Sequence, residues 1–81
     1  MKTFTDESGT RWVADAREEN TPRHHGRFYL VFYPEAEPAR TCAVPEIRWQ
    51  NAATAARTIA TMSELELCRR LYSARSRFAT V

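Results

Sequence analysis

Histidine and cysteine are the residues of this sequence best suited to bind a metal or to support nucleophilic catalysis. His24 and His25 are adjacent, whereas Cys42 and Cys68 are isolated from any second ligand. Zinc sites usually take pairs of ligands separated by a few residues, and adjacent histidines seldom reach one metal together. A nucleophile would need an oriented histidine beside it, and no motif provides one. The spacing therefore predicts neither a metal site nor a nucleophilic site.

Sites built on glycine loops or on paired carboxylates are also disfavoured. The chain has only two glycines, so it lacks the glycine-rich loops that cradle phosphates or dinucleotides. Paired carboxylates such as Glu18 with Glu19, and Glu35 with Glu37, fall in polar turns, where we expect them to be solvated. We therefore predict no catalytic residues, no cofactor and no small-molecule substrate, which means that the chain is not an enzyme.

The most distinctive polar cluster is Arg23-His24-His25-Gly26-Arg27. Two guanidinium groups and two imidazole rings at one end of a strand could hold a phosphate, a carboxylate or an acidic protein surface. A solvated loop is the alternative for a cluster this short.

Residues 27–33 give the strongest strand signal, and both faces of that strand are apolar or aromatic. The two faces are Phe28, Leu30 and Phe32, and Tyr29, Val31 and Tyr33. Such a strand is either covered on both sides or has a second face that meets a partner. A base-stacking platform is a third interpretation, but basic residues flank this run rather than interleave with it.

Three further strands are expected around this one. Residues 2–5 and 10–17 alternate on either side of a polar turn that ends in Gly9 and predict a hairpin. Residues 18–26 are polar and contain Pro22, which predicts a loop, and residues 34–38 predict a turn. Residues 40–49 alternate again, and Pro45 predicts an edge strand or a bulge. The inward candidates of this last strand are Cys42, Val44, Ile47 and Trp49.

After residue 49 the apolar period changes from two to about 3.6, which indicates two helices. Asn51 is the expected N-cap of the first helix. Ser63 and Glu66 are spaced as a capping box at the start of the second. The expected buried stripes are Ala52, Ala55, Ala56 and Ile59 in the first helix, and Leu67, Cys68, Leu71 and Tyr72 in the second.

The sequence as a whole predicts an α+β fold, in which an antiparallel β-meander of three or four strands is followed by two short C-terminal helices packed on one face. We expect a single domain over residues 1–75 and a C-terminal tail over residues 76–81, because the tail has neither a cap nor a period. The expected core is Phe28, Leu30 and Phe32 with Trp12, Ile59, Leu67 and Leu71.

Composition narrows the expected role further. All basic residues except Lys2 are arginine, and the net charge is +2, well short of a dedicated nucleic-acid binder. The arginine and alanine bias is typical of a high-GC bacterial genome. The two isolated cysteines and the lack of an apolar leader favour a reducing, cytoplasmic location.

We therefore expect a protein-binding accessory subunit of a larger bacterial assembly, docked at the soluble surface of a membrane complex of energy metabolism. The alternative is a small nucleic-acid-associated or regulatory module. The predicted partner-binding residues are Arg23, His24, His25, Arg27, Tyr29, Tyr33, Arg69, Arg70, Arg75 and Arg77.

Overall fold

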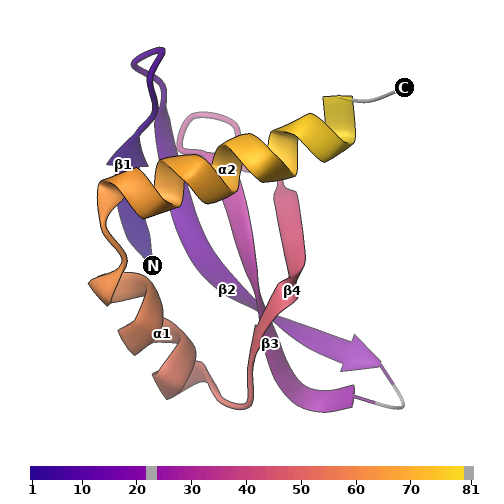
Figure 1. Cartoon of the computed structure of the whole chain (residues 1–81). Coiled ribbons are helices and arrows are strands. Elements are labelled where there is room, and N and C mark those ends of the chain that lie inside the picture. The colour runs from indigo at the N-terminus through magenta and orange to yellow at the C-terminus, as the bar shows by residue number, and fades with distance from the viewer. Residues whose placement is uncertain (22–23, 80–81) are drawn as a thin grey trace.

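The computed structural model describes residues 1–21 and 24–79, and the side chains of residues 1–19 and 27–76. Four antiparallel strands form one sheet in the order β1-β2-β3-β4, and two helices follow them along the chain (Figure 1). The elements are β1 (Lys2–Thr5), β2 (Arg11–Thr21), β3 (His24–Pro34), β4 (Cys42–Trp49), α1 (Ala52–Thr61) and α2 (Glu64–Ala79). Both helices lie on the same side of the sheet (Figure 1). The predicted α+β meander with two C-terminal helices is confirmed.

The core fills the space between the sheet and the two helices. Alternate residues of the strands point into it, and their partners come from one stripe of each helix. Phe4 and Phe32 pack edge to face, with ring centroids 5.7 Å apart. The buried cluster is Phe4, Trp12, Ala14, Leu30, Phe32, Val44, Ile59, Met62, Leu67, Leu71 and Ala74. The predicted core is confirmed except for Phe28, which is only half-buried and lies outside this cluster.

The hairpin of β2 and β3 is longer than the sequence predicted. The two strands remain paired through Glu19 opposite Arg27 and Thr21 opposite His24, with a register shift between Glu19 and Thr21. Residues 18–21 and 24–26 are therefore strand rather than loop. This part of the hairpin projects beyond the helices (Figure 1), so it needs no apolar face. Its strands are held by backbone hydrogen bonds. Such pairing leaves no alternation of apolar and polar residues in the sequence, which is why these residues did not read as strand. The projection also explains why Phe28 is not in the core.

Pro45 interrupts the edge strand β4, as predicted. Leu30 of β3 pairs with Val44, but the preceding residue Tyr29 pairs with Arg48, so residues 45–47 bulge out of the ladder. Proline has no amide hydrogen to donate at this point. The Arg48 side chain spans the bulge, because its Nε donates to the Pro45 carbonyl.

Both predicted helix starts are confirmed. The Asn51 side chain accepts a hydrogen bond from the Thr54 amide at 2.7 Å. Ser63 Oγ accepts from the Glu66 amide at 3.1 Å. The second half of the capping box does not form, since the Glu66 carboxylate pairs with Arg70 at 3.2 Å instead of returning to the Ser63 amide.

The buried stripes of the helices are narrower than predicted. In α1, Ala55 and Ile59 are buried, whereas Ala52 and Ala56 are exposed. In α2 the stripe is Leu67, Leu71 and Ala74, with Cys68 half-buried beside it. Tyr72 is 76% exposed, because it lies about 140° around the helix from Leu67 and faces away from the sheet.

Helix α2 also extends further than predicted. It ends at Ala79, so residues 76–79 are helical rather than part of a trailing tail. Once a helix has started, each added residue gains its own hydrogen bond at little further cost. The helix therefore continues past the point where the sequence shows no cap and no period.

Candidate functional site

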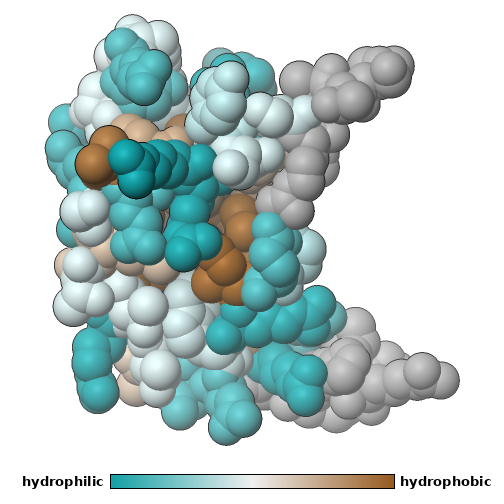
Figure 2. Space-filling view, in the orientation of Figure 1, coloured by the Kyte–Doolittle hydropathy of each residue, from teal (hydrophilic) through white to brown (hydrophobic). Residues whose placement is uncertain are grey.

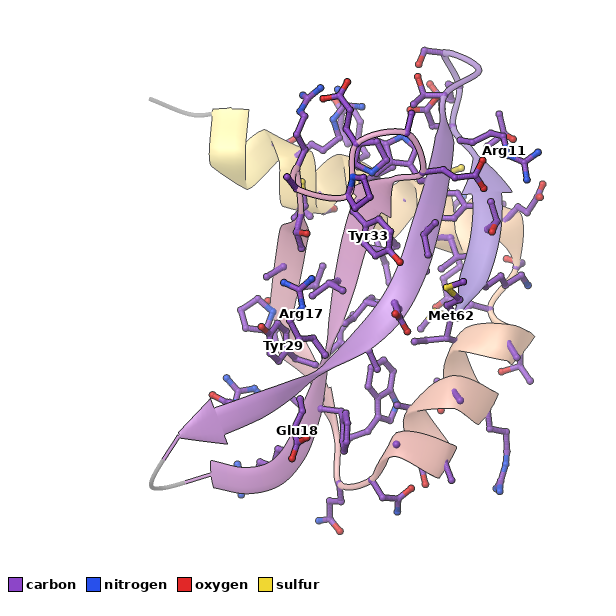
Figure 3. All side chains as sticks on the ribbon, turned by 180° about the vertical axis from the view of Figure 1, so that it is seen from behind. Arg11, Arg17, Glu18, Tyr29, Tyr33 and Met62 are labelled. Carbon is purple, nitrogen blue, oxygen red and sulfur yellow. The ribbon has the colours of Figure 1, made fainter. Side chains whose placement is uncertain are left out.

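The sheet face that points away from α1 and α2, here called the open face, is the candidate binding surface. Figure 3 views the molecule from this side, and none of the described helices covers it. The strand register places its side chains in three rows across the sheet. The rows are Thr3, Val13 and Tyr33; Asp15, Val31 and Ala43; and Arg17, Tyr29 and Arg48.

Larger neighbours on the same face bury the valines of the open face. Val13 is 4% exposed and Val31 is 1% exposed, although no described helix lies above them. Tyr29 and Tyr33 are half-buried and stand beside them. The sequence left open whether the chain covers this face itself. The side chains of the open face cover it partly. The surface that remains exposed to solvent consists of the outer parts of two tyrosines and the surrounding arginines.

Most charges near the open face are already paired. Arg48 Nη1 lies 2.6 Å from Glu19 Oε2, and Arg11 Nε lies 3.4 Å from Glu35 Oε1. Arg17 has no carboxylate partner among the described residues, and it lies directly opposite Tyr29 on the neighbouring strand. Among the described residues, Arg17 is therefore a cation of the open face that stands unpaired beside an aromatic ring.

The predicted arginines of α2 lie on the other side of the molecule from the tyrosines. Arg69 is exposed on the helix surface, Arg70 pairs with Glu66, and Arg75 lies above the indole ring of Trp12, 5.5 Å from its centroid. These residues and the open face cannot form one flat contact surface.

The other predicted partner-binding residues lie in or near the β2–β3 hairpin and at the end of α2. Arg27 is exposed on β3. Arg23 lies outside the described residues, and so do the side chains of His24, His25 and Arg77.

Asp6 organises a polar cluster that the sequence analysis did not identify as a site. Its Oδ1 accepts from the amides of Ser8 and Thr10, each at 2.9 Å, and its Oδ2 accepts from Trp12 Nε1 at 2.7 Å. Arg75 Nη1 lies 3.8 Å from the same carboxylate. Asp6 therefore joins the β1–β2 turn to α2. The available signal in the sequence was the spacing F-x-D-x-x-G-x-x-W from Phe4 to Trp12. It places an acid and an indole on the two sides of one tight β-turn.

The acidity of Asp6 follows from these contacts. Burial alone raises the pKa of Asp6, but the hydrogen bonds from Ser8, Trp12 and Thr10 outweigh burial and lower this pKa below its ordinary value. The carboxylate therefore stays ionised at neutral pH. A carboxylate that is held in its charged form by several hydrogen-bond donors stabilises the fold and is poorly suited to proton transfer.

Cys68 is a poor candidate for chemistry. Burial, followed by the negative charges of Asp6, Glu64 and Glu7, raises the pKa of the Cys68 thiol, so it stays protonated at neutral pH. A protonated thiol is a weak nucleophile and a weak metal ligand. Its Sγ lies 3.5 Å from the Thr5 carbonyl, which fits a packing role.

We predict that metal removal leaves the fold unchanged. No three His, Cys, Asp or Glu residues of the described chain are grouped so that they could hold an ion, and the sequence offers no ligand pairs. The melting temperature measured by circular dichroism should be the same with and without EDTA. Stoichiometric zinc in elemental analysis, or loss of the native spectrum in EDTA, would contradict this.

Comparison with known proteins gives no assignment: no family model, no curated protein and no solved structure matches this chain. Within the part of the chain that the structure describes, no helix is long and apolar enough to cross a membrane. The function is therefore argued from the surfaces alone.

Proposed function

We propose that this chain is a non-enzymatic subunit that binds another protein through the open face. The observation that supports this most directly is the placement of Tyr29 and Tyr33 on a sheet face that no described helix covers. In a two-layer α+β domain one sheet face packs on helices, and the other is usually polar. Here the second face keeps two aromatic residues and two buried valines.

The chemistry of the open face suits a protein partner. Tyrosine and arginine are enriched in protein interfaces, because each combines a large contact area with an oriented polar group. Val31 lies almost fully buried between its neighbours, and the tyrosines beside it are themselves partly buried. Side chains that are already fixed lose less entropy when they bind.

The wider setting is proposed on composition. The arginine and alanine bias favours a bacterial source, and the small size favours an accessory subunit that works within a larger assembly. We propose attachment at the soluble surface of a membrane complex of energy metabolism, since small subunits of this kind are common there.

The test replaces one tyrosine of the open face. Tyr33→Ala should weaken capture of a stoichiometric partner from native lysate by at least fivefold, because a central interface tyrosine commonly contributes more than about 1 kcal/mol. Tyr72→Ala removes the same side chain from the opposite side of the molecule and is the matched control. Equal capture by both variants and by the unmodified chain would rule out the open face as the docking surface.

A nucleic-acid-associated module is the second candidate, and the row of Arg17, Tyr29 and Arg48 is the observation that favours it. A base stacked on Tyr29 would have a cation on either side, as in single-strand binding sheets. Against this, Glu19 already neutralises Arg48, and Asp15 lies on the same face.

Salt dependence separates the two candidates. Binding to generic single- or double-stranded nucleic acid should be absent at both about 50 and about 200 mM salt, the range over which phosphate contacts lose most of their affinity. Micromolar binding that collapses at the higher salt would favour the nucleic-acid module instead.

A further inference from the structure

Two opposite charges on the open face have no ion-pair partner among the described residues. Asp15 and Arg17 lie two residues apart on β2, and both side chains are on this face. Arg17 is exposed, whereas Asp15 is half-buried opposite Val31. The Asp15 carboxylate accepts a hydrogen bond from the Ala16 amide at 2.8 Å. A carboxylate next to an apolar side chain is stabilised by a cation brought against it.

Aromatic and apolar surface surrounds these two charges. Tyr29 is half-buried and lies opposite Arg17 on the neighbouring strand. Tyr33 is also half-buried, and its hydroxyl donates to Sδ of Met1 at 3.9 Å. Met1 is 77% exposed. By contrast, Figure 2 shows that the helix side of the molecule is mainly hydrophilic. Aromatic contact area of the kind found on the open face is typical of protein interfaces.

The positions of Asp15 and Arg17 make the open face complementary to itself. Two such faces can meet about a two-fold axis that lies between the sheets and crosses the strands, so that each strand lies antiparallel to its own equivalent. When the axis passes between Asp15 and Arg17, Arg17 faces Asp15 of the second copy. By the same symmetry, Asp15 faces Arg17 of the second copy, so opposite charges are paired twice, as in any isologous interface.

We propose that the open face binds a second copy of this chain in this arrangement, with the two β2 strands antiparallel. This contact rests on the function proposed above, because it uses the same docking surface and names one partner for it. On β3, Tyr29 packs on Val31 of the second copy, since Tyr29 lies in the row of Arg17 and Val31 in the row of Asp15.

The charges next to this central pair do not meet like charges in the dimer. Each described side chain faces the one that lies equally far from the axis on the same strand of the second copy. These facing pairs are Glu19 with Val13, Arg27 with Tyr33, and Arg48 with Ala43.

Charge also favours this arrangement over the other face-to-face dimer. A two-fold axis along the strands would place β2 on β3 of the second copy, so that Asp15 would lie on Val31 and Arg17 on Tyr29. Neither charge would meet an opposite charge there, and the Asp15 carboxylate would be buried against an apolar side chain, which is unfavourable.

The dimer is expected to be weak. Three rows of side chains on four strands cover roughly 400 Å² of each copy, at about 4.8 Å between strands and about 3.4 Å per residue. The total of roughly 800 Å² is below the roughly 1,000 Å² of a stable interface. Association should therefore appear only at high concentration, with a dissociation constant from about 0.1 to 1 mM.

Sedimentation equilibrium of the full chain in reducing buffer measures the association. The mass should lie close to the monomer value of 9.4 kDa at about 10 µM and rise toward twice that value at about 1 mM.

Charge reversal on β2 tests the pairing. Asp15→Arg and Arg17→Asp each place like charges against each other twice, and each should weaken self-association at least about fivefold. The double variant exchanges the two charges and should recover most of the loss. An equimolar mixture of the two single variants should also associate, because a face with two arginines then meets a face with two aspartates. An effect confined to one chain would not produce this recovery.

Tyr72→Ala is the matched control, because Tyr72 lies on the helix side of the molecule, and it should leave self-association unchanged. A melting temperature close to that of the unmodified chain checks that each variant is folded. Three outcomes would overturn the proposal. They are a mass that stays at the monomer value, single charge reversals that associate as the unmodified chain does, and a mixture that associates no better than either single variant.

The two proposals for the open face can fail separately. If the chain stays monomeric while Tyr33→Ala still weakens capture of another protein, the second copy is not the partner, but the open face is still the docking surface. If the charge reversals behave as expected while Tyr33→Ala leaves capture unchanged, the open face serves self-association and the proposed docking of another protein is wrong.

Discussion

Phe32→Ala is expected to destabilise the fold by about 3–5 kcal/mol, the usual cost of deleting a buried aromatic ring. Phe32 is completely buried on the central strand β3, and it packs edge to face against Phe4. The ring touches the sheet layer and faces the helix layer, so its loss leaves a cavity that neither layer can close fully. The core of a domain this small supplies a total stability of only about 3–5 kcal/mol, so this change should unfold a large fraction of the protein.

Urea denaturation followed by circular dichroism measures the Phe32 effect. The next residue, Tyr33, provides the control, because it points to the open face and Tyr33→Ala should cost much less. A midpoint for Phe32→Ala equal to that of the unmodified chain would contradict the assignment of Phe32 to the core.

Asp6→Ala is expected to cost about 2–4 kcal/mol, because it removes the acceptor for four donors at once. These are the amides of Ser8 and Thr10, the Ser8 hydroxyl and the Trp12 indole. Trp12 is buried, so its Nε1 would remain without a partner. The loss should also loosen Arg75 and the part of α2 that carries it. Asp15→Ala is the matched control, since Asp15 accepts only from its neighbour Ala16 among the described groups.

The same residue predicts a pH dependence with a definite sign. Because the folded-state pKa of Asp6 is lowered, its contribution to the free energy of unfolding is present above the unfolded pKa of about 3.9. It is lost as the pH falls through the lower folded value. Stability measured by urea denaturation should therefore fall below about pH 4, and it should fall less steeply in Asp6→Ala. An equal slope in both proteins would show that Asp6 is not the titrating group.

The sequence by itself determined the fold class, because the apolar period changes once, from two to about 3.6, after Trp49. It also determined both helix starts, since Asn51 and Ser63 are local caps whose hydrogen bonds lie within three residues. The irregularity at Pro45 was readable for a similar local reason, because proline has no amide hydrogen to donate to a ladder. Each of these features depends on chemistry between near neighbours in the chain.

Tertiary structure decided which residues of the apolar pattern are buried. Phe28 falls on the correct face of β3 but lies where the hairpin leaves the core, and alternation carries no information on how far the helices reach. Tyr72 belongs to a plausible stripe in the sequence, yet the position of α2 on the sheet leaves it exposed. The width of a buried stripe depends on the opposing surface, which lies far away in the sequence.

The candidate surfaces divide in the same way. Alternation alone placed Tyr29 and Tyr33 on a face separate from the core, and the register confirms this placement. Only the packing of α2 across the far side of the sheet separated them from Arg69 and Arg75, which the sequence had grouped into one binding set. The contact of Asp6 with Arg75 likewise exists only because the fold brings the β1–β2 turn against α2. Which distant residues lie side by side depends on how the sheet and the helices pack. The apolar period within one segment carries no information about that packing.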